Sequence, residues 1–200
     1  MEQPAVSAII LAGGASSRMG FNKALARLGQ GATLIEQVVA KVRLLSRDIV
    51  VVANDEESYR NLGLQVSPDV YPRTGSLGGI YSGLLAARHQ HALVVACDMP
   101  FLSLPLWHYM LGLPRDYDVL LPRLNGQPEP LHAVYSKQCL GPIKDLVERR
   151  RLKIIGFLHR VTVRFLDEAE IERFDPEHHS FLNVNTPEEL ARADALWRDI

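Results

Sequence analysis

Residues 6–24 read VSAIILAGGASSRMGFNKA, and this stretch decides the fold. Its first six residues form an almost continuous apolar run, which is typical of a strand buried on both faces of a sheet. Similar apolar runs follow at 48–53 and 92–97, and a segment with helical spacing of apolar residues, 33–46, lies between the first two. Strands that alternate with helices predict an α/β fold: a mostly parallel central sheet with helices on both faces.

The rest of the chain continues this alternation. We predict helices at 56–62, 78–89, 103–111, 137–150 and 186–197, and strands at 64–67, 118–121, 131–135 and 161–165. Asn125 and Gly126 are a typical two-residue turn between the strands at 118–121 and 131–135. Because no linker, repeat or low-complexity tract interrupts the pattern, we expect one domain over residues 1–200.

The composition excludes several classes of protein. Apolar residues make up 47% of the 200 residues and charged residues 22%, as in an ordinary globular chain. The net charge of −1 excludes bulk electrostatic binding to nucleic acid or a membrane. The longest apolar stretch near the start, 5–12, is too short for a membrane span, which needs about 20 residues. Cys97 and Cys139 lack metal or redox spacing, so we expect two buried thiols in a cytoplasmic protein.

Charge is uneven late in the chain. Residues 137–164 contain eight Lys and Arg against two acidic residues, whereas residues 165–200 contain three against ten. Two readings stay open. The stretches are either solvated helical faces that pair with each other, or the basic stretch receives an anionic substrate or an acidic partner.

The glycine-rich loop after the first strand suits a triphosphate. In a doubly wound sheet, ligands bind outside the carboxyl ends of the strands. Gly13 and Gly14 let backbone N–H groups approach an anion, and Arg18 and Lys23 add two cations. The spacing is neither a Walker A loop nor GxGxxG, and the latter absence disfavours a dinucleotide-dependent oxidoreductase.

Polar side chains follow the other predicted strands. Asp98 comes directly after the 92–97 strand, and Mg²⁺ prefers one or two carboxylates together with phosphate oxygens and water. The alternative is that Asp98 caps the helix after Pro100. Asn54 and Asp69 follow the strands at 48–53 and 64–67, where either could also be a plain turn residue.

Residues 11–24 resemble the signature LAGGxSxRMGxxKA of the nucleotidyltransferases that include the molybdenum cofactor guanylyltransferases. Further segments resemble motifs of that family: CDMP at 97–100, a segment that begins at Asp69, QPEPLHAVY at 127–135 and FLNVNTPEEL at 181–190. The resemblance extends over roughly 6–197. It implies a Rossmann-like nucleotidyltransferase fold, with a nucleotide-binding half in about 1–100 and an acceptor-binding half in about 101–200.

The resemblance implies an activity: transfer of GMP from Mg·GTP to the terminal phosphate of molybdenum-molybdopterin, with release of pyrophosphate. It implies Arg18, Lys23 and Asp98 as catalytic residues, with Asp98 as the Mg²⁺ ligand. The implied nucleotide-binding residues are Leu11, Ala12, Gly13, Gly14, Lys23, Asn54, Asp69 and Asp98. Chemically, a carboxylate such as Asp69 can accept from the N1–H and N2–H₂ groups of guanine, as carboxylates accept from base amines.

Base choice rests on Gly13. The guanylyltransferases read L-A-G-G at this place and the related cytidylyltransferases L-A-A-G, so Gly13 favours GTP. The chain departs from the family pattern at Asn22, often Asp, and at Ser76, usually Pro. The alternatives are a cytidylyltransferase for the same cofactor, a transferase for another phosphorylated acceptor such as a sugar phosphate, or a non-catalytic nucleotide sensor.

The acceptor side is less sharply defined. Arg123 and the basic stretch 137–164 are candidates for the pterin phosphate. Asn183 or Asn185 could assist the metal at Asp98, although Asn185 also suits a helix start. We expect His132 to be a packed strand residue. The expected partners are GTP, molybdenum-molybdopterin, proteins that deliver molybdopterin and molybdoenzymes that receive the product.

Overall fold

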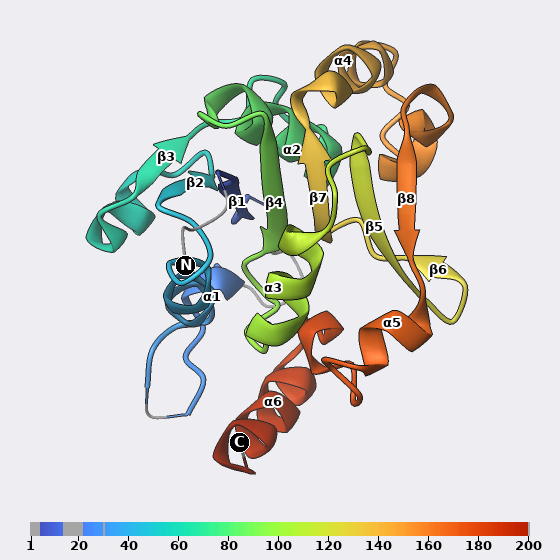
Figure 1. Ribbon diagram of the computed structural model, residues 1–200. Coiled ribbons are helices and arrows are strands. Elements are labelled where there is room, and N and C mark those ends of the chain that lie inside the picture. Colours follow the sequence, from blue (N-terminus) through green and yellow to red (C-terminus); the bar gives the residue numbers. More distant parts are fainter. Residues whose placement is uncertain (1–4, 14–21, 30, 200) are drawn as a thin grey trace.

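The computed structural model describes residues 5–13, 22–29 and 31–199 (Figure 1). The strands are β1 (Ser7–Leu11), β2 (Asp48–Val52), β3 (Gln65–Ser67), β4 (His91–Ala96), β5 (Val119–Leu124), β6 (Gln127–Pro128), β7 (His132–Ser136) and β8 (Val163–Leu166). The α-helices are α1 (Leu34–Val42), α2 (Gly75–Ala86), α3 (Leu104–Gly112), α4 (Leu140–Glu148), α5 (Glu168–Glu172) and α6 (Pro187–Asp199). Short 3₁₀ turns are η1 (Lys23–Leu25), η2 (Glu57–Leu62), η3 (Lys137–Cys139), η4 (Ile154–Arg160) and η5 (His179–Phe181).

The strands form one sheet in the order β3-β2-β1-β4-β7-β5-β6, with β8 paired to β5. The pairs β2–β3, β1–β2, β1–β4 and β5–β8 are parallel, which confirms the predicted, mostly parallel sheet. β7 runs antiparallel between β4 and β5. The carboxyl ends of β1, β2 and β4 therefore meet at one edge, called the carboxyl edge below, and their amino ends meet at the opposite amino edge.

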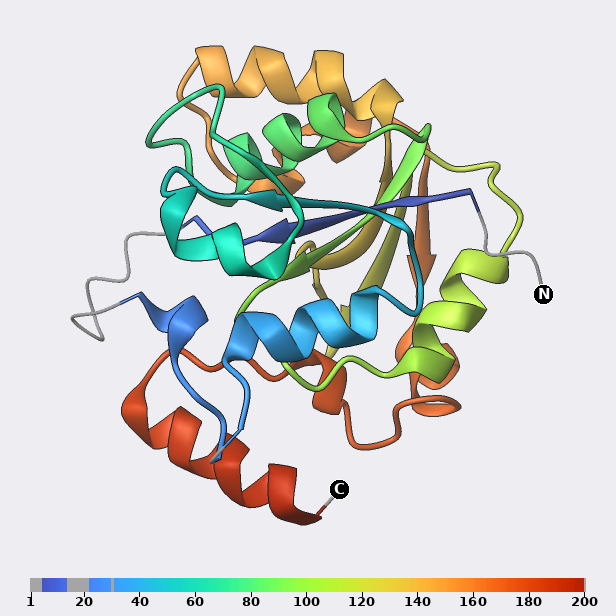
Figure 2. The ribbon, with the colours of Figure 1, turned by 90° about the vertical axis from the view of Figure 1, so that its left-hand side faces the viewer.

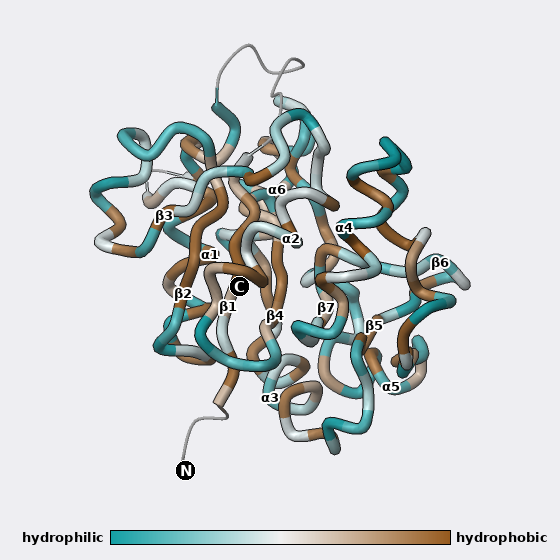
Figure 3. The backbone as a smooth tube through the Cα atoms, turned by 90° about the horizontal axis from the view of Figure 1, so that it is seen from above, coloured by the Kyte–Doolittle hydropathy of each residue, from teal (hydrophilic) through white to brown (hydrophobic). Residues whose placement is uncertain are grey.

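Helices cover both faces of the sheet, as predicted (Figure 2). α1 and α3 pack on the face that receives Ala8 and Ile10 of β1, whereas α2 and α4 pack on the face that receives Ile9 and Leu11. Alternate residues of the same strand thus serve two separate cores. The hydropathy colouring shows apolar residues concentrated along β1, β2 and β4 (Figure 3). Both cysteines are buried and free, as expected.

Local signals set several boundaries. A capping box begins α1, since Thr33 and Glu36 bond reciprocally, and the Ser103 side chain caps α3. The helix predicted at 78–89 instead spans Gly75–Ala86, because the backbone becomes extended at Ala87 to enter β4. The helix predicted at 137–150 begins with a 3₁₀ turn and ends at Glu148, where Arg150 (φ 55°) turns the chain.

Five elements were not predicted: β6, α5, η1, η4 and η5. The turn at Asn125 and Gly126 joins β5 to β6, not to the strand predicted at 131–135. Both turn residues have positive φ (49° and 74°), so a partner strand must start directly after them. In the part of the chain that the structure describes, no helix is long and apolar enough to cross a membrane.

Candidate active site

Two adjoining cavities open at the carboxyl edge. The larger, of about 530 Å³, lies between the ends of β1, β2 and β3, and the smaller, of about 350 Å³, between the ends of β1 and β4. Both are lined by Ala12, Gly13 and Asn22. The larger holds Asn54 and Asp69, and the smaller holds Lys23 and Asp98. We call them the base cleft and the phosphate pocket, after the parts of a nucleotide that the resemblance leads us to expect at these residues.

The phosphate pocket contains a three-residue cluster. Lys23 begins η1, Asp98 follows β4 and Asn185 lies just before α6. Lys23 Nζ forms an ion pair with Asp98 Oδ2 and donates to Asn185 Oδ1 at 2.8 Å. The Val184 N–H also donates to the Asp98 carbonyl at 2.9 Å, which ties the segment before α6 to the end of β4. The fold thus joins groups 162 residues apart in the sequence.

This cluster fits a divalent metal. Asp98 is only 5% exposed, and its Oδ1 atom is buried without a hydrogen-bond partner among the described residues. A buried, unpaired carboxylate oxygen is costly unless a ligand satisfies it. The Oδ1 atom of Asp98 and the amide oxygen of Asn185 are both oxygen ligands of the kind that Mg²⁺ binds. Of the two asparagines considered from the sequence, Asn185 meets the cluster, whereas Asn183 lines the pocket and donates to the Phe181 carbonyl.

The base cleft contains a carboxylate–amide pair. The Asn54 Nδ2 atom donates to Asp69 Oδ2 at 3.2 Å, and the Asp69 N–H donates to Asn54 Oδ1 at 2.9 Å. Burial raises the pKa of Asp69, and its Oδ1 atom has no partner among the described residues. A Cβ at Gly13 would lie 3.7 Å from Asp69 Oδ2, so the glycine leaves this carboxylate open toward β1.

Tyr59 is a site residue that the sequence analysis did not single out. Its hydroxyl donates to the Ala12 carbonyl at 3.1 Å and accepts from Asn22 Nδ2 at 2.9 Å. Burial raises the pKa of Tyr59, so the phenol stays protonated and keeps this bond. Tyr59 thereby fixes Asn22, the cap of η1, beside Lys23. Its burial follows from apolar packing, but its partners depend on long-range folding and leave no local signal.

Not all of the remaining predicted residues lie in the two cavities. Gly14 and Arg18 lie outside the described residues. Leu11, like Ala12 and Gly13, lines the phosphate pocket. The Arg123 guanidinium stacks over the Phe165 ring at 3.8 Å.

The basic stretch forms a cavity of its own. It has a volume of about 430 Å³, between α4 and η4, with Arg149, Arg151 and Lys153 in its lining. Its described lining residues differ from those of both carboxyl-edge cavities. The described ion pairs of this stretch, such as Arg160–Asp145, are internal to it, and the acidic α6 lies in the opposite layer (Figure 2).

His132 is a packed strand residue, as predicted. It is fully buried in β7, stacked on Trp107 with ring centroids 4.4 Å apart, and burial lowers its pKa to about 3. A neutral ring inside the core is not available to a substrate in the phosphate pocket.

A doubly wound sheet that gathers a lysine, a carboxylate and amides at the carboxyl ends of β1, β2 and β4 defines a class: a nucleotidyltransferase domain. The match to known proteins agrees with it. Residues 8–162 match the MobA-like NTP transferase domain. The chain therefore belongs to the MobA-like NTP transferase family.

Relatives support this assignment along nearly the whole chain. The chain is 38% identical to a protein of Desulfosudis oleivorans named molybdenum cofactor guanylyltransferase, over 96% of this chain and 95% of the relative. It is 37% identical to a probable molybdenum cofactor guanylyltransferase of Pelotomaculum thermopropionicum, over 94% and 91%. The crystal structure of molybdopterin-guanine dinucleotide biosynthesis protein A from Archaeoglobus fulgidus superposes with a TM-score of 0.84, at 28% identity, and covers 98% of this chain and 100% of that chain.

Proposed function

We propose that this protein transfers GMP from Mg·GTP to the terminal phosphate of molybdenum-molybdopterin. The α-phosphorus–oxygen bond to pyrophosphate breaks, and a new bond to the acceptor phosphate oxygen forms. The observation that carries this proposal is the Lys23–Asp98–Asn185 cluster beside the base cleft, in a chain whose relatives are named guanylyltransferases.

The residues of the phosphate pocket have separable roles. Lys23 would neutralise the negative charge that builds up on the leaving pyrophosphate, and Arg18 would assist it. Asp98 would hold Mg²⁺ through its unpaired Oδ1 atom, helped by Asn185. Bound Mg²⁺ would supply charge neutralisation on the phosphate oxygens. A phosphate acceptor is already ionised at pH 7, so the site needs no general base.

The base cleft would select guanine. Asp69, oriented by Asn54, can accept from the N1–H and N2–H₂ groups of that base. Gly13 and Gly14 would let the loop after β1 approach the triphosphate. A Cβ at Gly13 would lie 3.7 Å from Asp69 Oδ2, so its absence would leave this carboxylate accessible and would favour GTP over CTP. The second candidate function is a cytidylyltransferase, which would use CTP.

The remaining expectations belong to the same proposal. The nucleotide-binding half would be about 1–100 and the acceptor-binding half about 101–200 of a single domain. Arg123 and the basic stretch stay candidates for the pterin phosphate. Proteins that deliver molybdopterin and molybdoenzymes that take up the product would be the partners, in the cytoplasm.

Pyrophosphate release tests the function. GTP, CTP and UTP are each supplied with Mg²⁺, with and without molybdenum cofactor. We expect release only with GTP and cofactor together. Release with CTP would identify a cytidylyltransferase, and no release with any nucleotide and this cofactor would refute the proposed acceptor.

A further inference from the structure

Arg73 is a cation in the base cleft without an assigned role. It lines the cleft with Asn54 and Asp69, although it follows them in the sequence on a separate turn before α2. Its side chain is exposed, and among the residues that the structure describes it forms no ion pair. A carboxylate and an unpaired guanidinium therefore share one cavity.

The turn that carries Arg73 is firmly held. The Thr74 hydroxyl is buried and donates to the Tyr71 carbonyl at 2.5 Å, and the Tyr71 ring packs on Tyr81 with centroids 5.3 Å apart. A Cβ at Gly78 would collide with Thr74 Oγ1, so this glycine makes room for the packed threonine. The guanidinium of Arg73 is thus attached to a backbone turn that packing and hydrogen bonding hold in place.

The backbone of Arg73 adds to this picture. Its φ of 62° lies in the left-handed region, which glycine and asparagine favour and which an arginine rarely adopts. A glycine would fit the turn better, so the turn does not explain the arginine. Glycine is also a substitution that can remove the guanidinium and keep the turn.

We propose that Arg73 recognises the O6 and N7 acceptors of the guanine base. This inference rests on the proposed function and deepens it by adding a second specificity-determining residue. Arginine binds the O6/N7 edge of guanine with two parallel hydrogen bonds, while a carboxylate such as Asp69 accepts from N1–H and N2–H₂. Guanine alone among the bases offers this pair of edges. Adenine would turn its N6 donor toward Arg73, and cytosine has no N7.

The test compares GTP with 7-deaza-GTP, which lacks the N7 acceptor and keeps the other groups. Calorimetric binding of the Mg²⁺ complexes is measured for the wild type, Arg73→Gly, Arg73→Lys and the control Arg88→Ala. Arg88 is an exposed arginine at the amino edge. We expect the wild type and Arg88→Ala to prefer GTP over 7-deaza-GTP by about tenfold, the value of one lost hydrogen bond to a charged group.

Arg73→Gly should bind both nucleotides with equal, weakened affinity. Arg73→Lys should also lose the preference, because an ammonium cannot form the two parallel bonds. If the wild type binds GTP and 7-deaza-GTP equally well, and Arg73→Gly weakens binding of both to the same extent, then Arg73 contacts the phosphates or the ribose. That result would overturn the inference. An unchanged preference in Arg73→Gly would overturn it as well.

The two proposals fail differently. If the wild type transfers GMP normally and Arg73→Gly keeps its base preference, only the inference on Arg73 fails. If the wild type does not bind Mg·GTP, both fail. The thermal midpoint of Arg73→Gly checks that the turn stays folded.

Discussion

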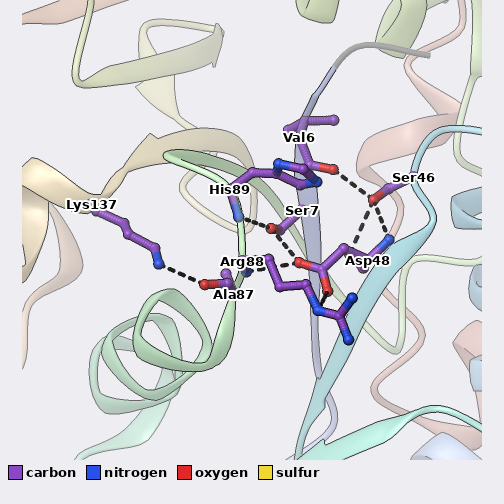
Figure 4. Close-up of polar contacts among 8 residues, drawn as sticks. All are labelled: Val6, Ser7, Ser46, Asp48, Ala87, Arg88, His89 and Lys137. Carbon is purple, nitrogen blue, oxygen red and sulfur yellow. Dashed lines mark hydrogen bonds and ion pairs between the residues drawn. The ribbon is translucent and has the colours of Figure 1, made fainter. Parts of the chain in front are cut away.

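The two edges of the sheet both hold carboxylates that are buried or half-buried, and the carboxylate oxygens find their partners differently at each edge. At the amino edge, Asp48 Oδ2 accepts from the Ser7 hydroxyl at 2.5 Å and from the Arg88 N–H at 2.9 Å, while its Oδ1 faces the Arg88 Nε atom at 3.4 Å (Figure 4). Ser46 bonds the Val6 carbonyl beside it. Every oxygen of Asp48 has a partner within the fold.

At the carboxyl edge, Asp69 and Asp98 each keep one buried oxygen without a partner among the described residues. Their remaining oxygens bind Asn54 and Lys23. Polar groups with complete partners stabilise a fold, and incomplete ones cost stability and point to a missing ligand. The difference separates structural polar residues from those we assign to the nucleotide.

The largest effect is expected at Asp98. Asp98→Asn keeps the shape of the side chain and removes the charge that would hold Mg²⁺, so turnover should fall by at least about a thousandfold, as for a lost transition-state contact. Lys23→Ala should have a similar effect. Pyrophosphate release measures both. Asp175→Asn is the control, because Asp175 is also buried but accepts from the N–H groups of His179 and Ser180. Full activity in Asp98→Asn would remove the distinction between the edges.

Asp48→Ala should give the opposite result. It leaves the Ser7 hydroxyl and the Arg88 N–H without their acceptor, so the free energy of unfolding should fall by about 1–3 kcal/mol. Turnover per folded molecule should not change. Urea unfolding with activity measured on the same sample checks this. A loss of activity with unchanged stability would contradict a purely structural role.

The positions of the carboxyl-edge residues, though not their contrast with Asp48, could be predicted from the sequence. The apolar runs placed β1, β2 and β4, and the residues after them, Gly13, Asn54 and Asp98, lie at the carboxyl edge as predicted. A strand end is a local signal that fixes a position in a parallel sheet. The antiparallel insertion of β7 was not predictable, because strand pairing depends on contacts far apart in the sequence.

The partners within the site were harder to predict than its positions. The contact between Lys23 and Asn185 spans 162 residues, and periodicity does not report contacts over such separations. Tyr59 and Arg73 reach the base cleft from a 3₁₀ turn and a left-handed turn. Neither turn carries a sequence pattern that indicates the direction of a side chain.

Gly13→Ala sharpens the comparison within the carboxyl edge. The new Cβ would lie 3.6 Å from the Val52 carbonyl and 3.7 Å from Asp69 Oδ2, both ordinary contacts, so the fold should persist. It would partly cover the carboxylate that we assign to guanine. We expect the ratio of kcat/KM for GTP to that for CTP to fall about tenfold, the value of one weakened hydrogen bond to a charged group. An unchanged ratio would remove Gly13 from base selection.

His132 shows that a polar group without a partner does not by itself indicate a ligand site. Both of its ring nitrogens lack partners among the described residues, yet it is sealed in the core. Burial lowers the pKa of His132 from its ordinary value of 6.5 to about 3 in the fold, so between these values the side chain is protonated only in the unfolded state. Unfolding free energy should therefore fall on acidification between these values, by up to about 1.4 kcal/mol per pH unit. His132→Phe should reduce this slope by one proton and leave turnover unchanged, as pH-dependent urea unfolding would show. An unchanged slope would mean that His132 is already protonated in the fold.

The division of labour between the two carboxylates of the carboxyl edge is tested most directly by calorimetric binding of GTP and of inorganic tripolyphosphate, with and without Mg²⁺. The wild type should gain affinity for both ligands when Mg²⁺ is added and should prefer GTP. Asp98→Asn should lose the gain from Mg²⁺, whereas Asp69→Asn should keep that gain and lose the preference for GTP. A full Mg²⁺ gain in Asp98→Asn would contradict the account.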